Sequence, residues 1–181
     1  DIMGMDAVFV HMALTYYCPK AGGNSKAFWM SEEKLKKLCE RAQKQAPLVI
    51  GAKATELILP DTTEQVWKSL HKLPNDYVLL VFWDPHCGHC KKELPALYTS
   101  YRDTLRPMGI EVFSVAKATD KKLFDDWKAF IREHRMDWVN VGLTHTVYEE
   151  AKKDPYKYIP KLTTIQSLNY ADSYDVYATP K

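Results

Sequence analysis

Two cysteines separated by two residues, Cys87 and Cys90, are the part of this sequence best suited to chemistry. They follow an apolar run, Val78–Phe82, which predicts a strand buried on both faces of a sheet. They also open a segment with helical spacing of apolar residues. A Cys-x-x-Cys pair where a strand passes into a helix is typical of a dithiol redox site. The sequence therefore predicts a site that opens and closes a disulfide.

The start of the helix indicates which cysteine reacts. A helix N-terminus carries roughly half a positive charge and several unpaired N–H groups, so it favours an anion there. Cys87 comes first, and its thiolate is expected to have a pKa below the ordinary value of about 8.5. Cys90 lies a turn further in, where burial raises the pKa. His89 is expected to favour the thiolate through its partial charge. We predict that Cys87 is the nucleophile and that Cys90 resolves the mixed disulfide.

A motif around these cysteines resembles the thioredoxin superfamily: Phe82-Trp83-x-x-x-Cys87-x-x-Cys90-Lys91. Its ending, Glu93-x-Pro95, is similar to the TlpA/ResA-like thiol–disulfide oxidoreductases of bacterial envelopes. The inner dipeptide, Gly88-His89, is the one that protein disulfide isomerases use. The resemblance covers roughly residues 50–181. It implies an α/β fold with a thioredoxin-like sheet flanked by helices.

The resemblance also implies residues around the cysteines. The family's proline that faces the dithiol would be Pro180, preceded by Thr179, with a cis peptide bond close to Cys87. Thr179 and Pro180 are therefore candidate substrate-binding residues. Trp83 is expected to be partly core and partly beside the substrate groove. His86 is a further candidate for substrate binding, and the alternative is an exposed loop residue without a role.

The sequence departs from the family at the residue that moves a proton. Thioredoxins often place an acid in the buried strand six positions before the first cysteine, and here that position is Val81. Glu93, Asp84 or a water molecule would have to move the proton of Cys90. Glu93 is retained as the candidate residue, although the sequence does not choose among the three.

Zinc and haem are the alternatives for a Cys-x-x-Cys pair. Cys87 and Cys90 could form half of a zinc site with His86 and His89, but structural zinc usually requires a second pair of ligands at regular spacing. The sequence shows none. Haem attachment requires a histidine directly after the second cysteine, and that residue is Lys91. We expect neither a metal nor a cofactor.

Composition excludes several classes of protein. A chain of 181 residues with 46% hydrophobic content can form one domain and an appendage. A formal charge of +2 gives no reason to expect nucleic acid or a membrane surface as a partner. No apolar run approaches the ~18 residues that a membrane helix requires. Asp1-Ile2-Met3 does not begin a signal peptide.

Residues 1–47 are predicted to be a helical extension, the tail of a larger N-terminal domain. One helix is expected over Ala7–Tyr17 and a second from the capping residue Ser31 to Pro47, which together form a helical hairpin. Cys18 and Cys39 flank its turn. A bridge is conceivable if their Cα atoms lie within roughly 7 Å, but we expect two reduced, buried thiols.

Residues 48–181 are predicted to be the thioredoxin-like domain. The expected elements are an edge strand, a short helix, two further strands and a helix capped by Asp120: Ala54–Leu59, Val66–Leu73, Ile110–Val115, Trp138–Leu143 and the segment after Asp120. This βαβ order implies a parallel core. The family continues past its proline into two strands and a closing helix, whereas this chain stops at Lys181. The sheet is therefore expected to lack these C-terminal elements.

Residues 144–177 are long for the connection that leads to the family's proline, so an insertion with two or three short helices is expected. Because this segment ends beside the dithiol, it could form a wall that selects substrates. A surface insertion without a role is equally favoured.

The favoured function is disulfide exchange with protein thiols by a reductase that a membrane thiol–disulfide donor recharges. The expected location is the periplasm of the bacterial cell envelope, and a lipid anchor through a missing N-terminus is conceivable. An isomerase or oxidant is the alternative within the same chemistry, which Gly88-His89 would suit. A non-catalytic binding module is the alternative of a different class, and a peroxidase would not normally use this cysteine pair.

Overall fold

The computed structural model describes residues 5–19 and 25–181. The chain divides into two compact units, Asp1–Thr55 with Ala171–Asp175, and Glu56–Tyr170 with Val176–Lys181. No helix of the described residues combines the length and the apolar character that a membrane span requires. The predicted domain boundary after residue 47 and the predicted insertion over 144–177 stay predictions.

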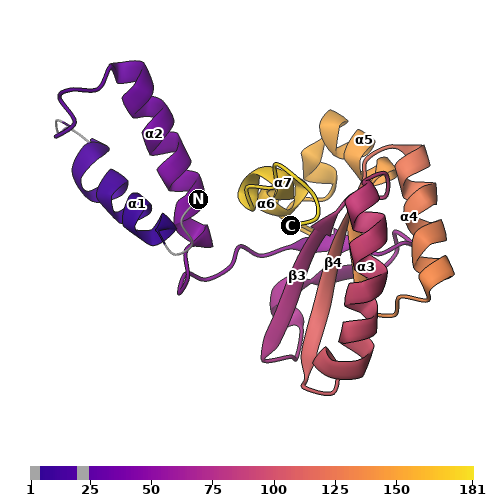
Figure 1. The fold of residues 1–181 in the computed structure, drawn as a ribbon. Helices are drawn as coiled ribbons and strands as arrows, with labels where there is room; N and C mark the ends of the chain where they lie inside the picture. Colours follow the sequence, from indigo (N-terminus) through magenta and orange to yellow (C-terminus); the bar gives the residue numbers. More distant parts are fainter. Residues whose placement is uncertain (1–4, 20–24) are drawn as a thin grey trace. The chain divides into compact units, whose positions relative to one another are not determined.

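The first unit is built around two helices (Figure 1). Helix α1 (Asp6–Met12) continues as a π-helical turn over Ala13–Tyr17, and α2 spans Glu32–Gln45. The small residues Ala13 and Ala42 are buried between them together with Val10. A short 3₁₀ turn, Ala46–Leu48, follows α2. The predicted helical hairpin is confirmed, although Ser31 precedes α2 without a hydrogen bond from its side chain to the helix.

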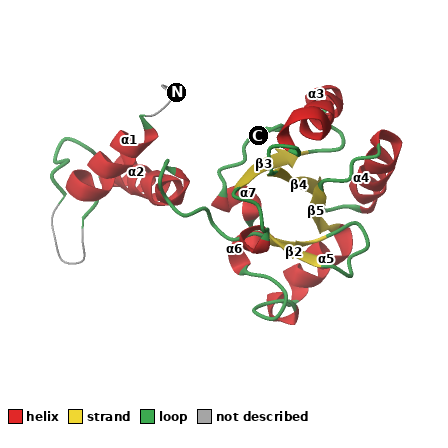
Figure 2. Cartoon of the chain, turned by 90° about the horizontal axis from the view of Figure 1, so that it is seen from below, coloured by secondary structure: helices red, strands yellow, loops and turns green. Residues whose placement is uncertain are grey.

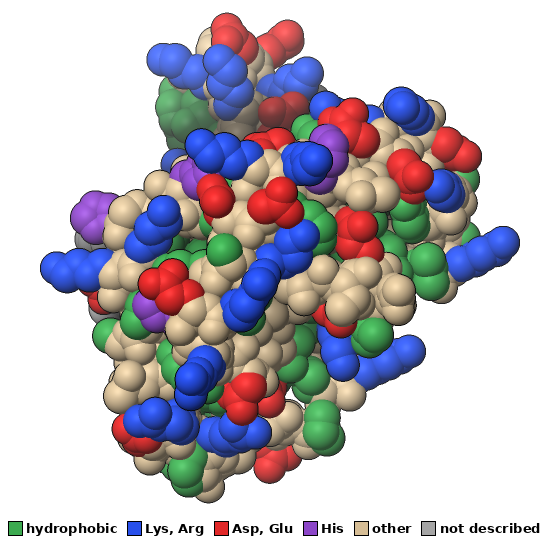
Figure 3. All heavy atoms as spheres, turned by 90° about the vertical axis from the view of Figure 1, so that its right-hand side faces the viewer, with side chains coloured by type: hydrophobic (Ala, Val, Ile, Leu, Met, Phe, Trp, Pro, Cys, Tyr) green, Lys and Arg blue, Asp and Glu red, His purple; other side chains and the backbone are tan. Residues whose placement is uncertain are grey.

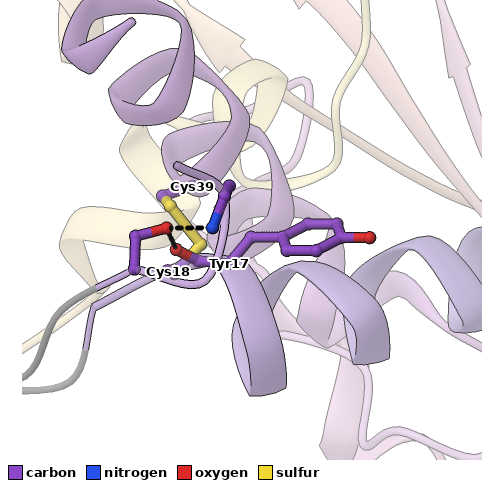
Figure 4. Close-up of a disulfide and its surroundings, with 5 residues drawn as sticks. Tyr17, Cys18 and Cys39 are labelled. Carbon is purple, nitrogen blue, oxygen red and sulfur yellow. Dashed lines mark hydrogen bonds between the residues drawn. A yellow bond between two sulfur atoms is a disulfide. The ribbon is translucent and has the colours of Figure 1, made fainter. Parts of the chain in front are cut away.

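A disulfide joins Cys18 to Cys39, with 5.6 Å between the two Cα atoms (Figure 4). The prediction of two reduced thiols is therefore wrong. The hairpin brings the end of the π-helical turn beside the middle of α2, within the range that a disulfide can span. Next to the bridge, the Ser25 hydroxyl donates to the carbonyl of Tyr17 and accepts from the N–H of Ala27.

The disulfide is expected to stabilise the hairpin, because it closes a long loop in the unfolded chain. Its two cysteines lie 21 residues apart. Replacing both with serine should cost about 3 kcal/mol and lower the protection of α2 amides against hydrogen exchange by roughly a hundredfold. Hydrogen exchange with mass spectrometry on the full chain measures this change. The Cys87→Ser/Cys90→Ser variant is the control, and equal protection of α2 in both variants would contradict the prediction.

The second unit contains a parallel three-stranded sheet in the order β3-β4-β5. Its strands are β3 (Tyr77–Trp83), β4 (Ile110–Ala118) and β5 (Val139–Thr144). Helix α3 (Gly88–Ser100) connects β3 to β4 and ends in a π-helical turn, while α4 (Lys121–His134) connects β4 to β5. Figure 2 shows α3 and α4 on one side of this sheet and α5 and α6 on the other. The predicted α/β fold with a parallel core is confirmed.

The core lies between the sheet and the helices α3 and α4. Val81 and Trp83 of β3, Val112 and Ala116 of β4 and Trp127 of α4 belong to one buried cluster. At Gly142 of β5, an added Cβ would lie 2.7 Å from the Ala116 carbonyl oxygen and 3.2 Å from the Trp127 ring. This close approach leaves no room for a side chain at that position. As predicted, Asp120 caps α4 by accepting from the N–H of Leu123 at 2.8 Å.

A second sheet is a short antiparallel pair, β1 (Ile58–Pro60) and β2 (Trp67–Ser69). The helix predicted over Val66–Leu73 is therefore wrong for its first half, and only a 3₁₀ turn, Leu70–Lys72, follows β2. The weak local preference for a helix is overridden because the backbone of β2 pairs with β1, with Ile58 opposite Ser69.

Strand β3 is less buried than its apolar sequence predicts. Its last three residues are buried, but Tyr77 at its start is 72% exposed and Leu79 is 37% exposed. The difference arises because β3 is the outer strand of the parallel sheet, with β4 on one side. On its other side, Phe82 and Lys181 exchange two backbone hydrogen bonds of 2.7 and 3.0 Å. This pairing brings the end of the chain alongside the buried end of β3.

The segment between β5 and the end of the chain consists of short helices, as predicted. They are α5 (His145–Lys153), a 3₁₀ turn (Pro155–Lys157), α6 (Ile165–Leu168) and α7 (Tyr170–Ser173). In the second unit, Tyr170 stacks on Phe82 with 5.6 Å between the ring centroids. The segment thus packs on β3 close to where the cysteine loop begins.

Candidate active site at the start of α3

The loop between β3 and α3 is held by one aspartate. Asp84 follows the last residue of β3, and its carboxylate accepts from the N–H of His86 at 2.8 Å. Its backbone carbonyl accepts from the N–H of Cys87 at 3.0 Å. Such a turn is a common use of aspartate after a strand. It places Cys87 at the N-cap position of α3, with an extended backbone conformation.

The two thiols at this position differ in access. Both are free, Cys87 is partly exposed and Cys90 has no exposed surface. Cys90 belongs to the buried cluster of the core, and Cys87 packs against the edge of this cluster. A molecule in solution can therefore reach the sulfur of Cys87 but not that of Cys90.

The helix start favours the thiolate form of Cys87. The backbone N–H of Cys90 makes the largest contribution and lowers the pKa of Cys87, and the Cys90 thiol adds a second hydrogen bond. Burial opposes these two hydrogen bonds and raises the pKa of Cys87, while the Thr179 side chain and the backbone N–H of His89 lower this pKa by smaller amounts. The pKa of Cys90 is raised, chiefly because its burial disfavours a charge. The two thiols thus have opposite tendencies to ionise.

The end of the chain lies against the same sulfur. The Cys87 thiol donates to the backbone carbonyl of Thr179 at 3.3 Å. The Thr179–Pro180 peptide bond is cis. Both parts of the prediction for this dipeptide, the cis bond and its closeness to Cys87, are confirmed.

The AhpC/TSA family pattern matches residues 50–154. This range includes the strands β3, β4 and β5, the two cysteines of the dithiol and the helices α3 and α4. This chain belongs to the AhpC/TSA family. No curated protein matches it significantly.

Solved structures resemble this family member over most of its length. A domain of a possible thiol-disulfide isomerase from Cytophaga hutchinsonii is 32% identical, with a TM-score of 0.54, over 75% of this chain and 76% of that one. The thioredoxin domain of a thiol-disulfide oxidoreductase from Bacteroides vulgatus is 24% identical, with a TM-score of 0.52, over 72% and 76%. A thioredoxin-like protein from Bacteroides caccae has a TM-score of 0.56 at 21% identity, over 82% and 48%. The last two show the fold alone. Together with the dithiol, these findings make the chain a thioredoxin-like oxidoreductase.

Trp83 and His86, the two predicted substrate-binding residues near the cysteines, both contact other residues of this chain. Trp83 is 1% exposed, and its indole N–H donates to the Ser114 hydroxyl at 2.9 Å. It is therefore a core residue, and its ring lies 5.1 Å from that of Phe130 on α4. The expected place of Trp83 near a substrate groove stays a prediction. His86 is exposed, but its Nε2 lies 2.6 Å from a carboxylate oxygen of Asp126 on α4.

The side chain of His89 is exposed on the first turn of α3. Its contribution to the pKa of Cys87 comes from the backbone N–H, whereas the sequence suggested the imidazole. Any residue other than proline supplies an N–H at this position. The predicted tuning by the histidine side chain stays a prediction.

The two carboxylates predicted to accept the proton of Cys90, Glu93 and Asp84, differ in how far they are exposed to solvent. Glu93 is exposed on the second turn of α3. Asp84 is more enclosed, with 18% of its side chain exposed, and its carboxylate lies 3.5 Å from Lys117 Nζ. The backbone of Asp84 also contacts the Cys90 thiol. Asp84 is therefore the more enclosed of the two predicted carboxylates.

Two charged neighbours of the site, Asp126 and Lys117, are not predicted by the residue pattern around the cysteines. Lys117 directly follows Ala116, which lies opposite Trp83 in the sheet register. The carboxyl ends of neighbouring parallel strands meet at one edge, so an alignment of β3 with β4 could have placed Lys117 beside Asp84. Asp126 gives no such signal, because its contact with His86 depends on the packing of α4.

The zinc alternative finds no support in the arrangement of ligands. Across residues 5–19 and 25–181, no three side chains of histidine, cysteine, aspartate or glutamate are grouped so that they could hold a metal ion. His86 is instead occupied by Asp126.

The opposite pKa shifts predict that the two cysteines react with alkylating agents over different pH ranges. In the reduced protein, Cys87 should reach half of its maximal rate with iodoacetamide below about pH 8.5, the ordinary midpoint of a thiol. Cys90 should react only above that pH and more slowly, because both its burial and its raised pKa oppose the reaction. Peptide mapping after timed alkylation measures both rates. Faster reaction of Cys90 at neutral pH would contradict the assignment.

Proposed function

We propose that this chain exchanges disulfides with protein thiols through Cys87 and Cys90 and acts as a reductase. The observation that carries the proposal is the asymmetry of the pair. Cys87 is accessible, has a lowered pKa and lies 3.3 Å from the Thr179 carbonyl, while Cys90 is buried behind it with a raised pKa. An exposed thiolate backed by a protonated thiol suits attack followed by resolution.

The proposed reaction has two exchange steps. The Cys87 thiolate attacks one sulfur of a substrate disulfide, whose bond breaks, and the second substrate sulfur leaves as a thiolate that takes a proton. Cys90 then loses its proton and attacks the Cys87 sulfur. This step forms the Cys87–Cys90 disulfide and releases the first substrate thiol. The substrate gains two electrons, and the enzyme dithiol is oxidised.

The proton of Cys90 needs an acceptor in the second step. Val81 occupies the position where the thioredoxin superfamily often has an acid. Asp84 is the better of the two predicted carboxylates, because it follows β3 directly with only 18% of its side chain exposed, whereas Glu93 lies exposed on α3. We assign the proton transfer to Asp84, either directly or through water.

A bacterial envelope location with a membrane thiol–disulfide donor fits this function. The Cys18–Cys39 disulfide supports an oxidising compartment, where such bridges form and persist. A reductase in that setting needs electrons from outside the compartment, which supports a donor in the membrane.

An isomerase or oxidant is the second candidate. Two observations favour it: the Gly88-His89 dipeptide between the cysteines, and the 32% identity to the domain from Cytophaga hutchinsonii that is named a possible thiol-disulfide isomerase. The chemistry of exchange is the same, so the reduction potential of the dithiol decides between the two directions.

Serine variants test the exchange chemistry. Cys87→Ser should abolish the reduction of insulin, because the attacking sulfur is lost. Cys90→Ser should retain the first step and accumulate a mixed disulfide with the substrate, since the resolving sulfur is lost. Insulin turbidity and non-reducing mass spectrometry measure these outcomes. A wild-type chain without turnover would favour the non-catalytic binding module.

The reduction potential of Cys87–Cys90, measured by equilibration with glutathione or dithiothreitol, tests the direction. For a reductase we expect a value nearer to about −270 mV than to about −180 mV. A value near −180 mV would favour the isomerase, and one near −120 mV an oxidant. Titration of the Cys18→Ser/Cys39→Ser variant serves as the control, because it leaves only the active-site pair to exchange.

A further inference from the structure

A surface groove lies along one side of α4, close to the dithiol. Its cavity volume is about 390 Å³, within the range of roughly 300–1,000 Å³ that small-ligand sites occupy. Five lining residues come from α4: Asp126, Ala129, Phe130, Glu133 and His134. Their spacing places them on one face over two helical turns. Pro85 and Lys91 complete the lining, and this set of residues is called the α4 groove below.

The α4 groove adjoins the active-site segment at three points. Pro85 lies two residues before Cys87, and Lys91 directly follows Cys90 on α3. His86 provides a third connection, because its imidazole contacts Asp126 at 2.6 Å. The groove therefore adjoins the segment that carries the two cysteines and runs along α4. A polypeptide bonded to Cys87 could enter it without a change in the fold.

The lining combines apolar surface with polar groups of both signs. The apolar part is the exposed Ala129 together with the small exposed parts of Pro85 and Phe130, which are otherwise buried. Lys91 and Glu133 border it, and neither forms an ion pair with any residue of the described ranges. Figure 3 shows that basic and acidic side chains are interspersed on the face that it presents. Such a surface suits a neutral polypeptide backbone with an apolar side chain better than a ligand of one strong charge.

We propose that the α4 groove is a subsite for the polypeptide of a protein substrate, next to its reacting cysteine. An apolar side chain beside that cysteine packs on Ala129 and on the small exposed parts of Pro85 and Phe130. Lys91 and Glu133 pair with the polar groups of the bound backbone. The subsite rests on the proposed function, since it acts on a substrate held at Cys87. It gives the enzyme a preference among protein substrates that the dithiol alone cannot provide.

Two synthetic peptide disulfides test the subsite, one with leucine and one with glycine beside the cysteine. The reduced wild-type chain should reduce the leucine peptide with a kcat/KM about tenfold higher, because an apolar side chain leaves water on binding. Ala129→Trp fills the groove from an exposed position of α4 and should remove this preference, mainly through KM. Its rate with the small aromatic disulfide DTNB and the alkylation pH profile of Cys87 should stay unchanged.

Ala96→Trp is the matched control, because Ala96 is an exposed helical alanine of α3 outside the groove. It should keep the preference for leucine.

If circular dichroism shows that Ala129→Trp does not fold, Ala129→Leu replaces it, and the same loss of preference is expected. A preference that survives in the folded variant overturns the subsite. An equal loss of activity with oxidised glutathione also overturns it, in favour of a site for small charged thiols. Failure of the wild type with DTNB would instead refute the proposed exchange function.

Discussion

The arrangement of the active site depends on hydrogen bonds from the first turn of α3 to the Cys87 sulfur. The backbone N–H of Cys90 contributes most to the lowered pKa of Cys87, and that of His89 adds to it. These groups have no helical partners at this position, so an anion there is stabilised without a dedicated basic side chain. The Asp84 turn places Cys87 where these donors point, and the buried end of β3 holds Asp84.

The same geometry makes the two thiols unequal. One turn of helix moves Cys90 from the surface into the cluster formed by Val81, Trp83 and Leu94, where burial keeps it protonated. The chain end contributes from the opposite side, because the backbone pairing of Phe82 with Lys181 brings Thr179 to the Cys87 sulfur. A strand, a helix and a terminal segment therefore converge on one sulfur atom.

The two cysteine pairs of this chain show how packing decides the fate of the same chemical group. Cys18 and Cys39 are 21 residues apart in the sequence, but the helical hairpin brings their Cα atoms to 5.6 Å, and they form a disulfide. Cys87 and Cys90 lie on one helical turn at an accessible helix start, where the bridge can open and close. The first pair restricts the unfolded chain, and the second is suited to exchange electrons with other molecules.

The sequence by itself determined the dithiol, the strand and helix that flank it and the parallel α/β core, because these follow from local spacing and apolar periodicity. The cis bond before Pro180 came from the family resemblance. Only the tertiary structure decided the Cys18–Cys39 bridge, the burial of Trp83, the contact of His86 with Asp126 and the strand at Trp67–Ser69. Each of these features depends on a partner residue that is distant in the sequence or on the pairing of two strands. Local residue patterns do not determine which distant segments pack together.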